Sequence, residues 1–281
     1  MKIGVVTSWV DMLVLFRFLA KYDFSYEIVY DDLGRPWADK PLEFALERAR
    51  KAVDYFIGQG VKHIIAPPVL ELVLSKETKY SDYIFPLRQS YVLHECMPLS
   101  AVWKVGFAGE YGDLQAKELY EEVCIKYMPN ATQLERVAQL QKKKPDSKWQ
   151  LSFRWKEIVM WKYYLQKLGF KSQIVHHSMK ADFRYFKDAL VDTIVPTSYG
   201  LFAYESMLGK FLNTKKQRFH WLDAVETQFK GLIAAGKSGE GKYGVHIHYT
   251  GSLDLLVREK KWMRMLGRGK EVSIDTQKIV L

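Results

Sequence analysis

Hydroxyl and carboxyl side chains follow two apolar segments of this chain, one in each half. They are Thr7, Ser8 and Asp11 after residues 3–6, and Thr197, Ser198 and Tyr199 after residues 194–196. Each hydroxyl can donate and accept a hydrogen bond, so the two groups could together bind a small polar ligand. Asp11 or Tyr199 could also act there as a general base, provided that its surroundings shifted its pKa. A serine or threonine after a strand is also a common helix N-cap, so that structural role stays open.

Residues 31–39 add a further set of candidate contacts. Arg35 could pair with an anionic ligand because its planar guanidinium group matches a carboxylate. Asp32 could bind a ligand or only cap a turn. Trp37 would crowd a pocket built for a small polar molecule, so the pocket is either filled by the protein or takes a flatter, more apolar ligand. The sequence therefore predicts a small carboxylate or an apolar molecule as the ligand.

These candidate residues depend on strands that alternate with helices along most of the chain. Strands are predicted at 2–6, 26–30, 61–66, 104–108, 171–176, 193–195, 245–249 and 272–280, and helices at 10–21, 41–59, 114–127 and 253–266. The clearest helix starts at Pro41, carries apolar residues at helical spacing and ends at Gly60. Alternating strands and helices favour parallel sheets, whose carboxyl ends carry the chemistry. The predicted fold class is therefore α/β.

Several short segments, taken in order along the chain, resemble the glutamate racemases. The matching stretches are residues 3–9, 31–32, 35–40, 105–108, 222–227, 248–252 and 273–281. The resemblance covers most of the chain except 131–180. It implies two similar α/β domains with mainly parallel sheets and a ligand cleft between them. In that arrangement residues 1–100 and 216–281 form one domain, and residues 101–215 form the other.

The racemases of that family use two cysteines, which take a proton from one face of the substrate and return one to the other. In a gap-free alignment both cysteine positions are proline here, Pro67 and Pro196. The two cysteines of this chain, Cys96 and Cys124, fall elsewhere. Proline has no proton to exchange and lacks a backbone N–H. The resemblance therefore implies a racemase scaffold that does not racemise through two thiols.

One segment is strongly basic and aromatic. Residues 136–171 carry ten lysine or arginine side chains against two carboxylates, with aromatic residues between them. Basic side chains can contact phosphates while aromatic rings stack on bases, so nucleic acid or another polyanion is a candidate partner, as is a protein with an acidic surface. The apolar residues also recur at helical spacing, which favours an amphipathic helix with its lysines in solvent. Both interpretations stay open for the helical segment predicted at 131–180.

The composition agrees with a globular protein that has a large core. The chain has 281 residues, 48% of them hydrophobic, and a net charge of +10. No apolar run reaches the ~20 residues that a membrane-spanning helix needs. The first residues are typical of a strand rather than of a cleavable leader. Two cysteines are too few for a disulfide framework. We therefore expect a cytoplasmic protein with no membrane contact, no cofactor and no metal. The resemblance adds a homodimer, because family members often dimerise.

Three functions are open on the sequence alone. The first is a catalytically degenerate racemase-like protein that binds a small ligand or a protein partner. The second is an enzyme of the racemase superfamily that uses a non-cysteine acid or base. The third is a nucleic-acid or polyanion binder acting through residues 136–171. The first leads, because both catalytic positions have changed while the scaffold segments remain.

Overall fold

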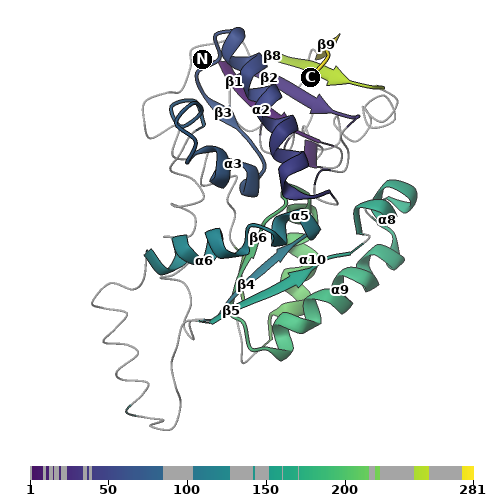
Figure 1. Cartoon of the computed structure of the whole chain (residues 1–281). Helices are drawn as coiled ribbons and strands as arrows, with labels where there is room; N and C mark the ends of the chain where they lie inside the picture. Colours follow the sequence, from purple (N-terminus) through teal and green to yellow (C-terminus); the bar gives the residue numbers. More distant parts are fainter. Residues whose placement is uncertain are drawn as a thin grey trace.

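The computed structural model shows two α/β units, one above the other (Figure 1). The residues that the structure describes are 2–8, 11, 12, 15, 19, 24–33, 37, 40–84, 104–126, 142, 152–159, 161–169, 171–214, 219–221, 244–252 and 274–281. The candidate contact Arg35 and the helix predicted at 253–266 lie outside these residues.

Five parallel strands form the first sheet, in the order β3-β1-β2-β8-β9. They are β1 (Lys2–Thr7), β2 (Ser25–Asp31), β3 (Ile64–Ile65), β8 (Gly244–Thr250) and β9 (Ile274–Lys278). Because β8 and β9 come from the last part of the sequence, the chain returns at its end to the sheet in which it began.

Helix α2 (Leu42–Gly58) lies against the first sheet, and α3 (Pro68–Leu74) follows β3 beside it (Figure 1). The buried residues of α2 recur at helical spacing and are Ala45, Leu46, Ala49, Ala52, Val53 and Phe56. Pro41 precedes the first turn, and Gly60 has a φ of 72°, which a glycine adopts without strain. The helix predicted from these two residues and the apolar spacing is confirmed.

Four parallel strands form the second sheet, in the order β5-β4-β6-β7. They are β4 (Lys104–Gly109), β5 (Ser152–Glu157), β6 (Thr193–Pro196) and β7 (His220–Trp221). The fold class predicted from the sequence, α/β with mainly parallel sheets in two similar units, is confirmed. The resemblance predicts that residues 216–281 belong to the first domain, but β7 pairs with β6, so the second sheet extends to Trp221.

Helices surround the second sheet (Figure 1). They are α5 (Tyr111–Leu114), α6 (Lys117–Lys126), α8 (Trp161–Leu168), α9 (Gln173–Asp188), the 3-10 helix η2 (Tyr199–Tyr204) and α10 (Glu205–Leu212). Over the described part of the chain, no helix has the length and the apolar character that crossing a membrane requires.

The segment predicted to be helical at 131–180 contains a strand. In β5, the aromatic residues Phe153 and Trp155 alternate with two basic residues, and both rings pack on Phe107 of the neighbouring strand. Lys156, on the alternating positions, forms an ion pair with Asp182 of α9 at 3.2 Å. The apparent helical spacing around Trp155 therefore comes from a strand of period two that is followed, after a short gap, by α8.

The strand predicted at 171–176 is also wrong, because α9 begins at Gln173. The buried side chains of α9 are Val175, Met179, Phe183 and Phe186, spaced three or four residues apart. Residues 171–176 alone are too few to show this longer period, and a short apolar run is compatible with either a strand or a helix. The helix prevails here since only the helical period places all four residues against the second sheet.

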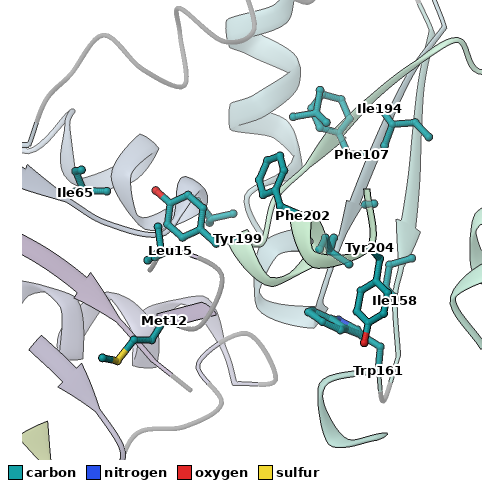
Figure 2. Close-up of a cluster of buried hydrophobic side chains, with 14 of the residues drawn as sticks. Met12, Leu15, Ile65, Phe107, Ile158, Trp161, Ile194, Tyr199, Phe202 and Tyr204 are labelled. Carbon is teal, nitrogen blue, oxygen red and sulfur yellow. The ribbon is translucent and has the colours of Figure 1, made fainter. Parts of the chain in front are cut away.

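One hydrophobic cluster joins the two units. It contains residues of both sheets, such as Ile28 and Phe107, together with Met12 and Leu15 from the segment after β1. Figure 2 shows Tyr199 within this cluster, between the labelled residues of the two units. The Tyr199 hydroxyl donates a 2.6 Å hydrogen bond to the carbonyl oxygen of Ala66, at the end of the first sheet. The two units are therefore held together by packing as well as by polar contacts.

Candidate functional site

A small cavity lies where the carboxyl ends of both sheets meet. Its volume is about 30 Å³, and its lining residues follow strands β1, β2, β3, β4 and β6 or belong to α2 and α3. One water molecule needs about 10–15 Å³ of such volume, so the cavity is small but holds more than a single water-sized group. The predicted cleft between the domains is present as this small, partly open space.

The cavity gathers five of the nine residues that the sequence singled out as contacts, namely Ser8, Asp11, Trp37, Thr197 and Ser198. Three others, Thr7, Asp32 and Tyr199, are buried but do not line it. Arg35 lies outside the described residues. Polar residues after β1 and β6 therefore do come together, as the parallel arrangement of the strands predicts.

Asp11 connects the two units through three contacts. Its Oδ1 accepts hydrogen bonds from Ser198 Oγ at 3.1 Å and from the Gly200 backbone N–H at 2.8 Å. Its Oδ2 lies 3.2 Å from Nζ of Lys162. Asp11 belongs to the first unit, whereas all three partners belong to the second. This carboxylate is therefore a structural tie between the units.

Lys162 is buried, with only 4% of its side chain exposed, and it also pairs with Glu110 at 2.7 Å. Burial raises the pKa of Glu110 to about 8, and the nearby Asp11 and Asp113 add to the shift while Lys162 opposes it. Burial alone would lower the pKa of Lys162, but Asp11 and Glu110 hold it above its ordinary value. Lys162 is therefore a fixed positive charge between two carboxyl groups.

Asp113 is the second carboxyl group that lines the cavity. Its Oδ2 accepts hydrogen bonds from the Glu110 backbone N–H at 3.0 Å and from Thr197 Oγ1 at 2.8 Å. Burial raises the pKa of Asp113 to about 6, against the lowering effect of these hydrogen bonds. A Cβ at position 109 would overlap Thr197 Oγ1, so Gly109 permits this hydrogen bond.

Trp37 forms an apolar wall of the cavity and is held by a buried polar network. Its Nε1 donates to Asp31 Oδ2 at 2.7 Å. Arg48 binds the same carboxylate through two nitrogens, at 2.8 and 2.5 Å, and Thr250 Oγ1 donates to it at 2.6 Å. Although burial raises the pKa of Asp31, these donors lower it overall. The network fixes Trp37 in place and keeps Asp31 ionised.

Solved glutamate racemases match almost the whole chain. The racemase isoform RacE1 of Bacillus anthracis superposes with a TM-score of 0.74 at 12% identity, over 99% of this chain and 97% of that one. The chain has the glutamate racemase fold. The Thermus thermophilus enzyme, solved with beta-chloro-D-alanine, gives 0.69 at 16% identity, over 100% and 97%. The Aquifex pyrophilus enzyme gives 0.65 at 16% identity, over 98% of both chains.

Among the comparisons, only that of the folded structures finds this likeness. No model of a known protein family matches the sequence, and no curated protein matches it either. At such low identity the fold is shared and the chemistry does not follow from it. The activity of this chain has to be argued from the residues at its own cavity.

The two prolines at the aligned cysteine positions occupy different places in this racemase fold. Pro67 precedes α3 and lines the cavity, whereas Pro196 is the last residue of β6, next to the lining residue Thr197. Cysteine is absent from the described residues around the cavity. Cys124 belongs to α6, and Cys96 lies outside the described residues. The alignment of prolines with the catalytic cysteines stays a prediction.

Glu110, Asp113 and Lys162 are cavity residues or neighbours that the sequence analysis missed. Glu110 and Asp113 directly follow β4, so the rule that located Thr7 and Ser8 after β1 could have found them. No comparable signal exists for Lys162, because it lies in a segment rich in lysines that read as solvent-exposed. Among the described residues, no cluster of three histidine, cysteine or acidic side chains is arranged to hold a metal ion.

Replacing Gly200 with alanine is expected to destabilise the fold by about 1 to 3 kcal/mol. A Cβ there would overlap the Trp161 ring and lie 2.9 Å from Asp11 Oδ1, which accepts the Gly200 N–H. Urea denaturation measures the change. The matched control is Gly58→Ala at the end of α2, where a Cβ meets no atom within 4 Å. That variant should be unchanged or stabilised by up to ~1 kcal/mol, and equal effects at both positions would contradict the argument.

Proposed function

We propose that this chain is a catalytically degenerate protein with the glutamate racemase fold, which keeps the interdomain cavity for binding and does not racemise through two cysteines. The observation that supports the proposal is the cavity itself. Its described lining includes Pro67 and no cysteine, its volume is about 30 Å³, and its Asp11 carboxylate is engaged by Ser198, Gly200 and Lys162.

Charge supports the same proposal. The described residues that line the cavity include two carboxyl groups, Asp11 and Asp113, and none is basic. Lys162 is occupied by Asp11 and Glu110. A dicarboxylic amino acid such as glutamate would therefore meet like charges, which weakens binding. A protein partner or a ligand of different charge fits these surroundings better than a racemase substrate.

Acid–base catalysis without cysteine is the second candidate. Glu110 and Asp113 have pKa values raised by burial to about 8 and about 6, close to neutral pH. General acid–base catalysis works best when the pKa of the catalytic group lies near the working pH. Asp113 lines the cavity, so it is better placed to exchange a proton with a ligand than Tyr199, whose hydroxyl is bonded to Ala66.

Deuterium exchange at Cα separates the two candidates. L- and D-forms of glutamate and aspartate are incubated with the protein in heavy water and followed by proton NMR, which detects proton abstraction even when net turnover is slow. We expect no exchange above the buffer control. Exchange that is lost in Asp113→Asn but kept in the exposed control Asp188→Asn would overturn the proposal and identify a cysteine-free base.

The remaining partner and location predictions belong to the same proposal. Residues 136–171 are the candidate surface for a polyanion or an acidic protein, with Lys156 of this segment already paired with Asp182. We also propose a cytoplasmic location and a homodimer. A steep loss of nucleic-acid binding with added salt would support the polyanion role.

A further inference from the structure

A second cavity lies between helices α9 and α10 of the second unit, and we name it the α9–α10 cavity. The two helices pack against each other beside the second sheet (Figure 1). The described residues that line this cavity do not overlap with those of the cavity at the strand ends. Its volume is about 430 Å³, which is within the range of small-molecule sites in proteins. The proposed function leaves this cavity without a role.

The lining of the α9–α10 cavity is basic. Lys180 of α9 and Lys210 of α10 both line it, and none of its described lining residues has a carboxyl group. Neither lysine forms an ion pair or a hydrogen bond within the described part of the chain. The carboxylate of Asp182, also on α9, pairs with Lys156 instead, and Glu205 lines a different cavity. Two positive charges therefore line the α9–α10 cavity without a counter-ion among the described residues.

The α10 side of the same cavity is largely apolar. Met207 and Phe211 lie about one helical turn apart, line the cavity and pack partly buried on the hydrophobic cluster. The ammonium group of Lys187 lies 5.2 Å from the centre of the Phe211 ring and donates to the Phe211 carbonyl oxygen at 3.4 Å, which helps to hold this residue. Aromatic rings pack well on phenylalanine and methionine side chains. The cavity therefore places an apolar surface beside two ammonium groups.

We propose that the α9–α10 cavity binds an aromatic phosphate monoester, whose phosphate contacts Lys180 and Lys210. The ring of this ligand packs against Met207 and Phe211. A phosphate monoester carries a charge of about −1.5 to −2 at neutral pH, which balances the two lysines, whereas a carboxylate would leave one ammonium group unpaired. The Ser206 hydroxyl also lines the cavity and can donate a hydrogen bond to a phosphate oxygen. Free aryl phosphates and phosphotyrosine side chains share this chemistry.

Binding is tested with phenyl phosphate, titrated into the whole protein at constant ionic strength and followed by ¹H–¹⁵N NMR. We expect saturable shifts of the Lys180, Met207 and Lys210 amide signals, while the Asp113 signal at the other cavity stays unshifted. Benzoate has the ring but a single charge, and inorganic phosphate lacks the ring, so each should bind about tenfold more weakly. The absence of saturable shifts with phenyl phosphate, or an equal affinity for inorganic phosphate, would overturn the inference.

Lysine variants test the assigned contacts. Lys180→Met and Lys210→Met each remove one positive charge and break no ion pair among the described residues, so the fold should be kept. Each variant should weaken phenyl phosphate binding about tenfold. The matched control Lys62→Met removes an exposed lysine of the first unit and should change the affinity by about twofold at most. Unchanged affinity in both cavity variants, or the same loss in Lys62→Met, would overturn the inference.

A short phosphotyrosine peptide with blocked ends distinguishes the two sources of the phosphate. Binding at least as tight as that of phenyl phosphate assigns the ligand to a phosphorylated protein, and weaker binding assigns it to a free aryl phosphate. Equal binding of the unphosphorylated peptide would overturn the inference, because the phosphate is then not recognised. The Cα-exchange experiment stays separate, since it concerns the cavity at the strand ends and not the α9–α10 cavity.

Discussion

Replacing Lys162 with methionine is expected to destabilise the protein by about 3 to 5 kcal/mol. The Lys162 ammonium group lies 3.2 Å from Asp11 and 2.7 Å from Glu110, and all three side chains are buried. Methionine fills much of the same volume, so the loss comes mainly from the buried Asp11 carboxylate, which is left without a counter-ion. Glu110 stays protonated and so carries no uncompensated charge. Asp11, in contrast, also holds the two units together through its hydrogen bonds. Urea denaturation at pH 7 measures the change.

The matched control is Lys76→Met. Lys76 also pairs with a glutamate, Glu122, at 3.3 Å, but both side chains are at least half exposed. Exposed ion pairs contribute ~0–1 kcal/mol, so this variant should differ little from the wild type. A double variant, Lys162→Met with Glu110→Gln, should recover little of the loss, because Glu110, with a pKa of about 8, already carries a proton at pH 7. Similar stabilities for Lys162→Met and Lys76→Met would contradict the structural role assigned to Lys162.

The parts of the site that could be predicted from the sequence are those governed by strand ends. Thr7, Ser8 and Thr197 follow buried apolar runs, and parallel strands bring their carboxyl ends to one edge of each sheet. The sequence could locate these residues without knowing the fold in detail. It could not decide which of them line the cavity, because that depends on side-chain packing around Trp37 and Tyr199.

Lys162 shows why the rest could not be predicted. Its neighbours in the sequence are basic and aromatic, and a lysine at helical spacing normally reaches solvent. Burial of this lysine requires carboxyl groups from two distant segments, those of Asp11 and Glu110, which no local pattern reveals. The error at 152–157 has a similar cause. A short alternating strand placed directly before a helix gives a mixed spacing that fits either period.

The cavity also shows how one fold can accommodate different side chains at the same positions. The parallel strands and their packing determine where residues 8, 67, 113 and 197 lie, whatever their types. A proline at position 67 is compatible with this geometry since it precedes the first turn of α3, where an N–H is not required by the helix. The fold can therefore be shared with the matched racemases at 12–16% identity.

The stability of the protein is expected to fall as the pH rises from about 6 to 8, and Glu110→Gln should remove most of that slope. Burial raises the pKa of Glu110 to about 8, above its ordinary value of 4.5, so the folded state keeps a proton that the unfolded state has lost. Stability falls with pH wherever the folded state binds more protons. The slope can reach about 1.4 kcal/mol per pH unit for one group. Urea denaturation at pH 5, 6, 7 and 8 measures it.

Other carboxyl groups change the stability in different pH ranges, so the effect of Glu110 can be separated from theirs. Asp113, with a pKa raised to about 6, lowers the stability mainly between pH 4 and 6. Asp31 and Glu27 have lowered pKa values, so their contributions increase with pH only through the acid range and are complete before pH 6. Glu110→Gln keeps the size of the side chain and a neutral partner for Lys162. A wild-type protein whose stability rises between pH 6 and 8, or a variant with an unchanged slope, would show that Glu110 is ionised in the fold.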